Sequence, residues 1–267
     1  MDKGSGECTR GFLKGIIVVL AIILVINVFV LGMQSGELSV SKATVTAKVA
    51  GTTQRTVPEE EVPTVDLFVM SECPFGLQME KALVPVMELL GDNANINVKW
   101  VSYLMHGEKE RDENTRQYCI QKEQKPLYTK YLRCYIEKGD SSTCQREAGI
   151  DTAKLNACVA KAQEEYGIMT SWNDRNSWLS GRYAQFNINK EENERYGVRG
   201  SPTLVINGEQ VRVSRSPEAV KEAICNTYKN PPKECSAQLS ENQEAPGHGP
   251  LGVNTGDVAA AAANCGG

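Results

Sequence analysis

The sequence has no excess of basic residues and very few histidines. It contains 29 Lys and Arg against 33 Asp and Glu, a formal net charge of −4, and only two histidines in 267 residues. A nucleic-acid-binding protein presents a basic face to phosphates, so this balance argues against that class. His106 and His248 are too few and too far apart for a histidine metal cluster or a Cys–His catalytic pair.

The sequence does contain nine cysteines. A reduced cytosolic protein of this size rarely keeps so many unless it binds a metal or carries out redox chemistry. A four-cysteine zinc site is the alternative to disulfides, but no two cysteines have Cys-x-x-Cys spacing, which structural zinc sites commonly use. We therefore expect disulfides and thiol chemistry, with no metal and no cofactor.

Residues 15–33 form a long apolar run whose only strongly polar side chain is Asn27. As a helix with a rise of ~1.5 Å per residue, this run spans ~28 Å, close to the ~30 Å of a bilayer core. Three basic residues precede it, and none follows before Lys42. This bias predicts a signal-anchor helix with residues 1–14 in the cytoplasm and the remaining chain extracytoplasmic. A cleaved signal peptide is the alternative, and it also exports the rest of the chain.

Composition divides the exported part of the chain into three segments. Residues 34–62 are polar and lack apolar periodicity, which predicts a stalk. Residues 237–267 are rich in Gly, Ala and Asn and are expected to be a flexible tail. The 174 residues of 63–236 are enough for one well-buried core.

Hydrophobic periodicity within 63–236 predicts a mixed α/β domain. The predicted order is a strand (64–70), a helix (from 74 to about 90), a strand (96–104), a helical block (about 108–175), a hairpin (202–213) and a last helix (217–228). A β-α-β unit followed by a hairpin and a helix resembles the thioredoxin fold. The helical block would be an insertion in the middle of that fold.

Cys73 comes directly after the first predicted strand, at the first turn of the following helix. Free amide groups and the positive end of the helix dipole stabilise a thiolate there, and a thiolate attacks disulfides. Pro74 suits the first helical position, and Pro74 and Gly76 would form the helix start that supports the thiolate. The alternative is a buried, inert cysteine that packs under the helix.

Pro202 begins a predicted strand and follows Ser201. In thioredoxin-like proteins the proline at this position is cis and lies beside the catalytic cysteine, so the resemblance implies a cis Ser201–Pro202 bond near Cys73. An ordinary trans proline at the start of an edge strand is the alternative.

The chain between these two features resembles the gamma-interferon-inducible lysosomal thiol reductase family. That family's signature is Cys-Gln-His-Gly, two residues, Glu-Cys, two residues, Asn, four residues, Cys. Five positions fit in register: His106, Gly107, Glu110, Asn114 and Cys119. The resemblance covers most of 63–236, with DsbA-like proteins as the wider group, and it implies a thiol–disulfide oxidoreductase that acts on protein disulfides.

The sequence departs from that family at its active site. Family members carry Cys-x-x-Cys, whereas Gly76 stands three residues after Cys73, and Leu104 and Arg111 replace two signature cysteines. A dithiol centre uses its second cysteine to break the mixed disulfide with the substrate, and a monothiol does not complete that step unaided. This chemistry favours isomerisation, or exchange with glutathione or another small thiol, over net reduction.

Six cysteines are predicted to form three disulfides: Cys119, Cys134, Cys144, Cys158, Cys225 and Cys235. The last two would staple the C-terminal helix to the chain after it, stabilising the fold by ~2 to 3 kcal/mol. The other four pair in one of three connectivities, among which the sequence does not choose.

Cys8 precedes the predicted membrane segment, which leaves Cys73 and Cys265 on the exported side. A flexible tail of 29 residues has an end-to-end distance of ~30 Å, comparable to the size of the domain. Cys265 is therefore a candidate resolving thiol for Cys73. The alternative is an incidental cysteine in an unstructured tail.

Together these features predict a membrane-anchored thiol–disulfide oxidoreductase or isomerase with Cys73 as its nucleophile. Phe75 would border the client groove, and Ser201 and Pro202 would offer backbone contacts to an extended peptide. The partners would be proteins that contain disulfides or thiols. The alternative is a redox-inactive thioredoxin-fold module that binds peptides or proteins, which the missing second cysteine favours and the retained Cys73 opposes.

Overall fold

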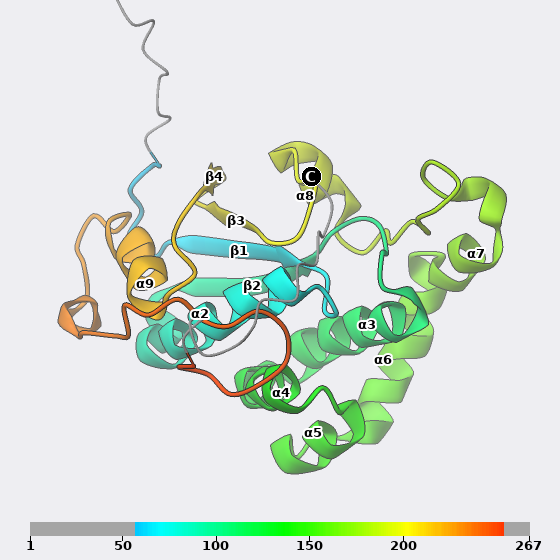
Figure 1. The fold of residues 1–267 in the computed structure, drawn as a ribbon, viewed down its shortest axis with the longest axis horizontal. Coiled ribbons are helices and arrows are strands. Elements are labelled where there is room, and N and C mark those ends of the chain that lie inside the picture. Colours follow the sequence, from blue (N-terminus) through cyan, green and yellow to red (C-terminus); the bar gives the residue numbers. More distant parts are fainter. Residues whose placement is uncertain (1–56, 254–267) are drawn as a thin grey trace, which may run out of the picture. The chain divides into compact units, whose positions relative to one another are not determined.

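The computed structural model describes residues 57–253 and is built around a four-stranded sheet of order β2-β1-β3-β4 (Figure 1). The strands are β1 (Thr64–Val69), β2 (Asn95–Trp100), β3 (Thr203–Ile206) and β4 (Glu209–Val211). β1 pairs in parallel with β2 and antiparallel with β3, and β3 pairs antiparallel with β4. This is the predicted β-α-β unit joined to a C-terminal hairpin, and the domain has a thioredoxin-like fold.

β1 is the central strand and is buried on both faces. Because successive side chains of a strand point to opposite faces, its residues divide between two clusters. Val65 and Leu67 belong to the main core, which includes much of α2 (Pro74–Leu90). Phe68 packs on the other face, where its ring centroid lies 6.1 Å from that of Tyr196 in α8 (Lys190–Tyr196).

The helical insertion predicted for about 108–175 is present (Figure 1). Its helices are α3 (Gly107–Glu123), α4 (Lys125–Lys138), α5 (Ser141–Ala148), α6 (Thr152–Glu165) and α7 (Ile168–Asn173). Asp140 and Asp151 are the N-cap residues of α5 and α6, and the side chain of each accepts hydrogen bonds from two backbone N–H groups of the first turn. The remaining elements are α9 (Pro217–Cys225) and the short 3-10 helices η1 (Gly91–Asn93), η2 (Arg175–Ser177) and η3 (Lys233–Ser236).

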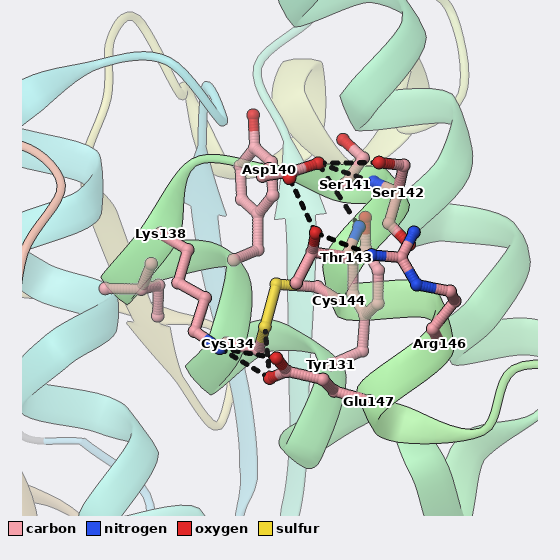
Figure 2. The surroundings of a disulfide bond; sticks show 12 residues. Tyr131, Cys134, Lys138, Asp140, Ser141, Ser142, Thr143, Cys144, Arg146 and Glu147 are labelled. Atoms are coloured by element: carbon pink, nitrogen blue, oxygen red, sulfur yellow. Dashed lines mark hydrogen bonds and ion pairs between the residues drawn. A yellow bond between two sulfur atoms is a disulfide. The ribbon is translucent and has the colours of Figure 1, made fainter.

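Three disulfides join elements of the described chain. Cys119–Cys158 joins α3 to α6, and Cys134–Cys144 joins α4 to α5, which settles the connectivity that the sequence left open. Figure 2 shows the second of these bonds beside Glu147, whose carboxylate is 2.6 Å from Lys138 Nζ. The predicted Cys225–Cys235 bond is present and connects α9 to η3.

Two predicted boundaries differ from the structure. β2 ends at Trp100 rather than at residue 104: Val101 N–H still donates to Val69 O of β1 at 3.0 Å, but Leu104 N–H donates to Ala184 O at 2.9 Å, outside the sheet. The last helix ends at Cys225 rather than at 228, just where the disulfide to Cys235 begins.

Residues 237–253, here called the C-terminal strap, differ from the predicted flexible tail. The strap is held by backbone contacts along its length: Gly247 N–H donates to Pro74 O at 2.9 Å, and Gly249 N–H donates to Ile136 O at 3.0 Å. In Figure 1 this orange-to-red segment runs across α2 towards α4. The composition did not indicate this packing because backbone donors and acceptors are present whatever the side chains are.

The predicted membrane helix at 15–33 lies outside the described residues, as do 1–14 and most of the predicted stalk. It stays a prediction. Within residues 57–253, no helix is both long enough and apolar enough to span a bilayer.

Candidate functional site

Cys73 is the N-cap residue of α2, at the point where the chain leaves β1. Its N–H donates to Met70 O at 2.9 Å, and its carbonyl accepts from Leu77 N–H at 2.9 Å, so both backbone groups are fixed by the turn and by the helix start. Pro74 follows in the first turn, as expected, where a missing N–H leaves no hydrogen bond unmade. Cys73 thus stands at the end of α2 whose first amides have no partner within the helix, although its side chain makes no capping hydrogen bond.

The Cys73 side chain is fully buried and its sulfur is already engaged. Its exposed fraction is 0%, and it packs in the second hydrophobic cluster with Phe68 and Val205, against which Phe75 is also placed. Cys73 is disulfide-bonded in the structure. The six other described cysteines pair with one another.

The Ser201–Pro202 peptide bond is cis, as the thioredoxin resemblance implied. The Ser201 carbonyl oxygen lies 3.7 Å from Cys73 Sγ, and Ser201 Oγ accepts a hydrogen bond from Met70 N–H at 3.0 Å. Ser201 therefore links the loop before β3 to the residue that follows β1, close to the Cys73 sulfur. The structure brings Cys73, Ser201 and Pro202 together, as the sequence predicted.

Gly76 is required by the close approach of this loop. A Cβ at position 76 would lie 2.7 Å from Ser201 Oγ, which requires a displacement, and 3.0 Å from Met70 O, which is a tight contact. Gly76 stands where the resembled family has its second cysteine, and a side chain there would require the Ser201 hydroxyl to move.

Glu72, which the sequence analysis did not single out, is the most strongly perturbed carboxylate beside Cys73. Its Oε2 lies 2.8 Å from Lys109 Nζ of α3 and 3.9 Å from His248 Nε2 of the strap, and Tyr135 OH of α4 also donates to its carboxylate. Burial raises the pKa of Glu72, but the interactions with His248, Lys109 and Tyr135 outweigh burial and hold it at about 2. Glu72 thus joins α3, α4 and the strap next to the sulfur.

His248 is fixed by the strap at this cluster. Its Nδ1 lies 3.1 Å from Tyr135 O, which places an N–H donor against that carbonyl and leaves Nε2 facing Glu72. The ring also packs edge-on against Tyr135 at 5.3 Å between centroids. No sequence signal marked this residue, because it is 176 residues away from Glu72 along the chain.

The five signature residues of the resembled family run from His106, at the end of the loop after β2, along α3. His106 Nδ1 hydrogen-bonds the buried carboxylate of Glu110, which also accepts from Met105 N–H at 2.8 Å. Burial lowers the pKa of His106, but the bond to Glu110 outweighs burial and raises it. Asn114 Oδ1 accepts from Ser71 N–H at 3.1 Å, two residues before Cys73. Asn114 thus fixes the backbone just before Cys73, and Glu110 fixes the loop that contains His106.

A groove of about 400 Å³ opens beside the cis proline, on the β3–β4 side of the site. Pro202 and Leu204 of the β3 segment line it, together with Met79 of α2 and Arg215 before α9. The Arg215 guanidinium lies 4.9 Å from the centroid of the Phe75 ring, so Phe75 connects the groove to Cys73. Phe75 was predicted to border a groove from the sequence. Arg215 was not predicted, because it stands in no recognisable motif.

No group of three or more His, Cys, Asp or Glu side chains in residues 57–253 is arranged to hold a metal ion. Cys265, the predicted resolving thiol, and Cys8 lie outside these residues.

Solved structures with a similar fold include DsbA, DsbG and BdbD proteins. The fold is similar to oxidised DsbA from Mycobacterium tuberculosis (15% identity, TM-score 0.48, covering 67% of this chain and 95% of that one). It is also similar to reduced DsbG, a disulfide bond oxidoreductase of the same organism (16%, 0.46, 67% and 89%). BdbD from Bacillus subtilis matches as well (13%, 0.43, 65% and 92%). No family model and no curated protein sequence matches the chain. The fold assignment here rests on the strand order and pairing.

Proposed function

We propose that this protein exchanges thiols and disulfides with protein clients, using Cys73 as the nucleophile that attacks the client. The observation that carries the proposal is the placement of Cys73 Sγ at the start of α2, 3.7 Å from the carbonyl that precedes the cis Pro202. The free amides and dipole of α2 favour a thiolate at this position. With Gly76 in place of a second cysteine, Cys73 is the one thiol at the start of α2, which favours single-thiol chemistry there.

In the forward step the Cys73 thiolate attacks one sulfur of a client disulfide. A bond forms between Cys73 and that sulfur, the client S–S bond breaks, and the other client sulfur leaves as a thiolate that takes up a proton. A second thiol must then attack the mixed disulfide to release Cys73. Glutathione, another small thiol, or a second cysteine of the client meets that requirement, and in the last case the product is a rearranged client disulfide.

Cys265 is the proposed internal source of that second thiol. Three disulfides account for six of the nine cysteines, and Cys8 precedes the predicted membrane segment. The disulfide-bonded state of Cys73 supports a partner within this protein. On this proposal the Cys73–Cys265 disulfide is the oxidised form of the site, and a client thiolate that attacks Cys73 displaces the Cys265 sulfur.

The proposed location is extracytoplasmic, with residues 15–33 as the membrane anchor. The three disulfides of the described domain support it, because such bonds persist in oxidising compartments and are rare in the cytosol. An extended client segment would lie along Ser201 and Pro202 and contact their backbone, with Phe75 at its side.

Turnover of a disulfide-linked peptide tests the proposal. The full-length chain and a Cys73→Ser variant are compared with and without glutathione, and Cys265→Ser is measured in parallel. We expect Cys73→Ser to abolish exchange, and Cys265→Ser to make turnover depend on added glutathione. Equal rates for wild type and Cys73→Ser would contradict the enzymatic proposal.

The complete burial of Cys73 favours a second candidate, a redox-inactive peptide-binding module. After mild reduction, the pH dependence of Cys73 alkylation separates the two. Rapid alkylation well below pH 8 supports exchange chemistry, whereas slow alkylation with the pH profile of an ordinary thiol supports the binding module.

A further inference from the structure

The groove beside Pro202 has two charged lining residues, and both are arginines. Arg212 and Arg215 line it together with apolar side chains of Met79, Leu204 and Val211. Pro202 is part of the same wall, and its neighbour Ser201 lies 3.7 Å from the Cys73 sulfur. A ligand that reacts at Cys73 therefore lies next to this cationic groove.

Arg215 is half-buried and held in a fixed orientation. Its Nη1 donates to Gln78 Oε1 at 2.7 Å, and its guanidinium stacks over Phe75 at 4.9 Å from the ring centroid. Gln78 is itself anchored, since its Nε2 donates to Glu244 O of the strap. One helix, α2, and the strap thus hold the guanidinium at the edge of the groove.

Arg215 has no carboxylate partner among the described residues. Its protein acceptor is the neutral Gln78, and burial alone lowers the pKa of its guanidinium, with no acidic side chain opposing the effect. A guanidinium has five N–H donors in a fork that matches a carboxylate, and it stays charged at neutral pH. Other buried or half-buried arginines here are paired, for example Arg116 with Glu113 and Arg111 with Asp112.

We infer that this groove binds an acidic side chain of the client, so that Cys73 exchanges preferentially with cysteines flanked by Asp or Glu. The inference rests on the proposed function and names its substrate class. The charged lining supplies two cations and no anion, and the apolar walls accept the methylenes of a Glu side chain. Because an extended chain advances ~3.3 Å per residue, the acidic residue would stand about one to three positions from the reacting cysteine.

Matched peptides test this inference with the full-length chain. Each peptide carries one cysteine as a mixed disulfide with 2-mercaptoethanol, and Glu or Gln at one, two or three residues from it. The rate of mixed-disulfide formation with reduced Cys73 is followed by mass spectrometry. We expect the best Glu peptide to react about tenfold faster than its Gln counterpart at low ionic strength, and added salt to reduce that ratio.

Variants of Arg215 test whether this residue causes the preference for the Glu peptide. Arg215→Gln should bring the Glu-to-Gln ratio close to one, and Arg215→Lys should retain part of it, because the charge stays while the fork is lost. Arg146→Gln, a matched change on α5 away from the groove, should leave the ratio as in wild type. A ratio of one in the wild-type chain, or an unchanged ratio in Arg215→Gln, overturns the inference. The wild-type ratio and its salt dependence decide the question even where a variant does not fold.

A binding measurement separates this inference from the proposed function. The Cys73→Ser chain is titrated with fluorescent peptides in which Ser replaces Cys, so that no exchange takes place. Tighter binding of the Glu peptide, lost on adding Arg215→Gln, supports the inference that the cationic groove binds an acidic side chain, even where no exchange occurs and the proposed function fails. If glutathione, which carries carboxylates, binds in the groove but Glu peptides bind no better than Gln peptides, the assignment of the groove to protein clients is overturned.

Discussion

Gly76 and Ser201 approach so closely that any side chain at position 76 meets the Ser201 hydroxyl. The Cβ of such a side chain would stand 2.7 Å from Oγ, and that same oxygen already accepts a hydrogen bond from Met70 N–H at 3.0 Å. The serine therefore has two effects at one place: it ties the cis-proline loop to the end of β1, and its hydroxyl would have to move to admit a side chain at position 76.

Gly76→Ala should destabilise the domain by about 1–3 kcal/mol, because the new methyl group forces Ser201 or the backbone of Met70 to move. This outcome opposes helix propensity, by which Ala would be favoured by about 1 kcal/mol. Urea denaturation of Gly76→Ala, Ser201→Ala and the double variant measures the coupling. We expect the double variant to lose less than the sum of the two single changes. Strict additivity would show that the two positions do not collide.

The two disulfides of the insertion should differ in their contribution to stability. Cys119–Cys158 closes a separation of 39 residues, whereas Cys134–Cys144 closes one of 10. Loop closure then predicts that replacing the first pair by Ala costs about 1 kcal/mol more than replacing the second. Thermal and urea unfolding of the two double-Ala variants, made in otherwise identical chains, gives the comparison. An equal loss in both would indicate that loop length does not set the contribution of these bonds.

Glu72 should stabilise the fold above pH 4.5 and lose this effect in acid. Its pKa is lowered from 4.5 to about 2 in the folded protein, so its contribution is fully present above the unfolded value and disappears as the pH falls from about 4.5 through 2. We expect Glu72→Gln to cost on the order of 2 kcal/mol at pH 7 and very little near pH 2.

The difference in free energy of unfolding between wild type and Glu72→Gln, measured across this range, checks the expectation. Glu88→Gln is the matched control, because Glu88 forms an exposed pair with Arg133 at 2.6 Å. A wild-type advantage over Glu72→Gln that is the same at pH 7 and pH 2.5 would contradict the role given to the cluster of Glu72, Lys109 and Tyr135.

The Cys73 region was predictable because its signals are local. An apolar strand, a cysteine and a proline at a helix start follow one another directly, and strand and helix periods are properties of neighbouring residues. The cis bond was predicted from a proline that follows Ser201 at the start of a predicted strand. The Cys225–Cys235 bond was predicted from two cysteines only ten residues apart. The membrane segment at 15–33 was inferred in the same way, from an uninterrupted apolar run, and remains a prediction.

The sequence by itself determined the strand–cysteine–helix unit, the helical insertion and the presence of six cysteines for three bonds. The tertiary structure decided which insertion cysteines meet, where the strap lies, and that Glu72 and Arg215 flank the site. Those outcomes depend on contacts between residues far apart in the chain, such as Arg215 with Gln78 and Gly247 with Pro74. Single-residue patterns carry no record of such contacts, because backbone hydrogen bonds and isolated charged side chains find their partners only once the core has fixed the elements in space.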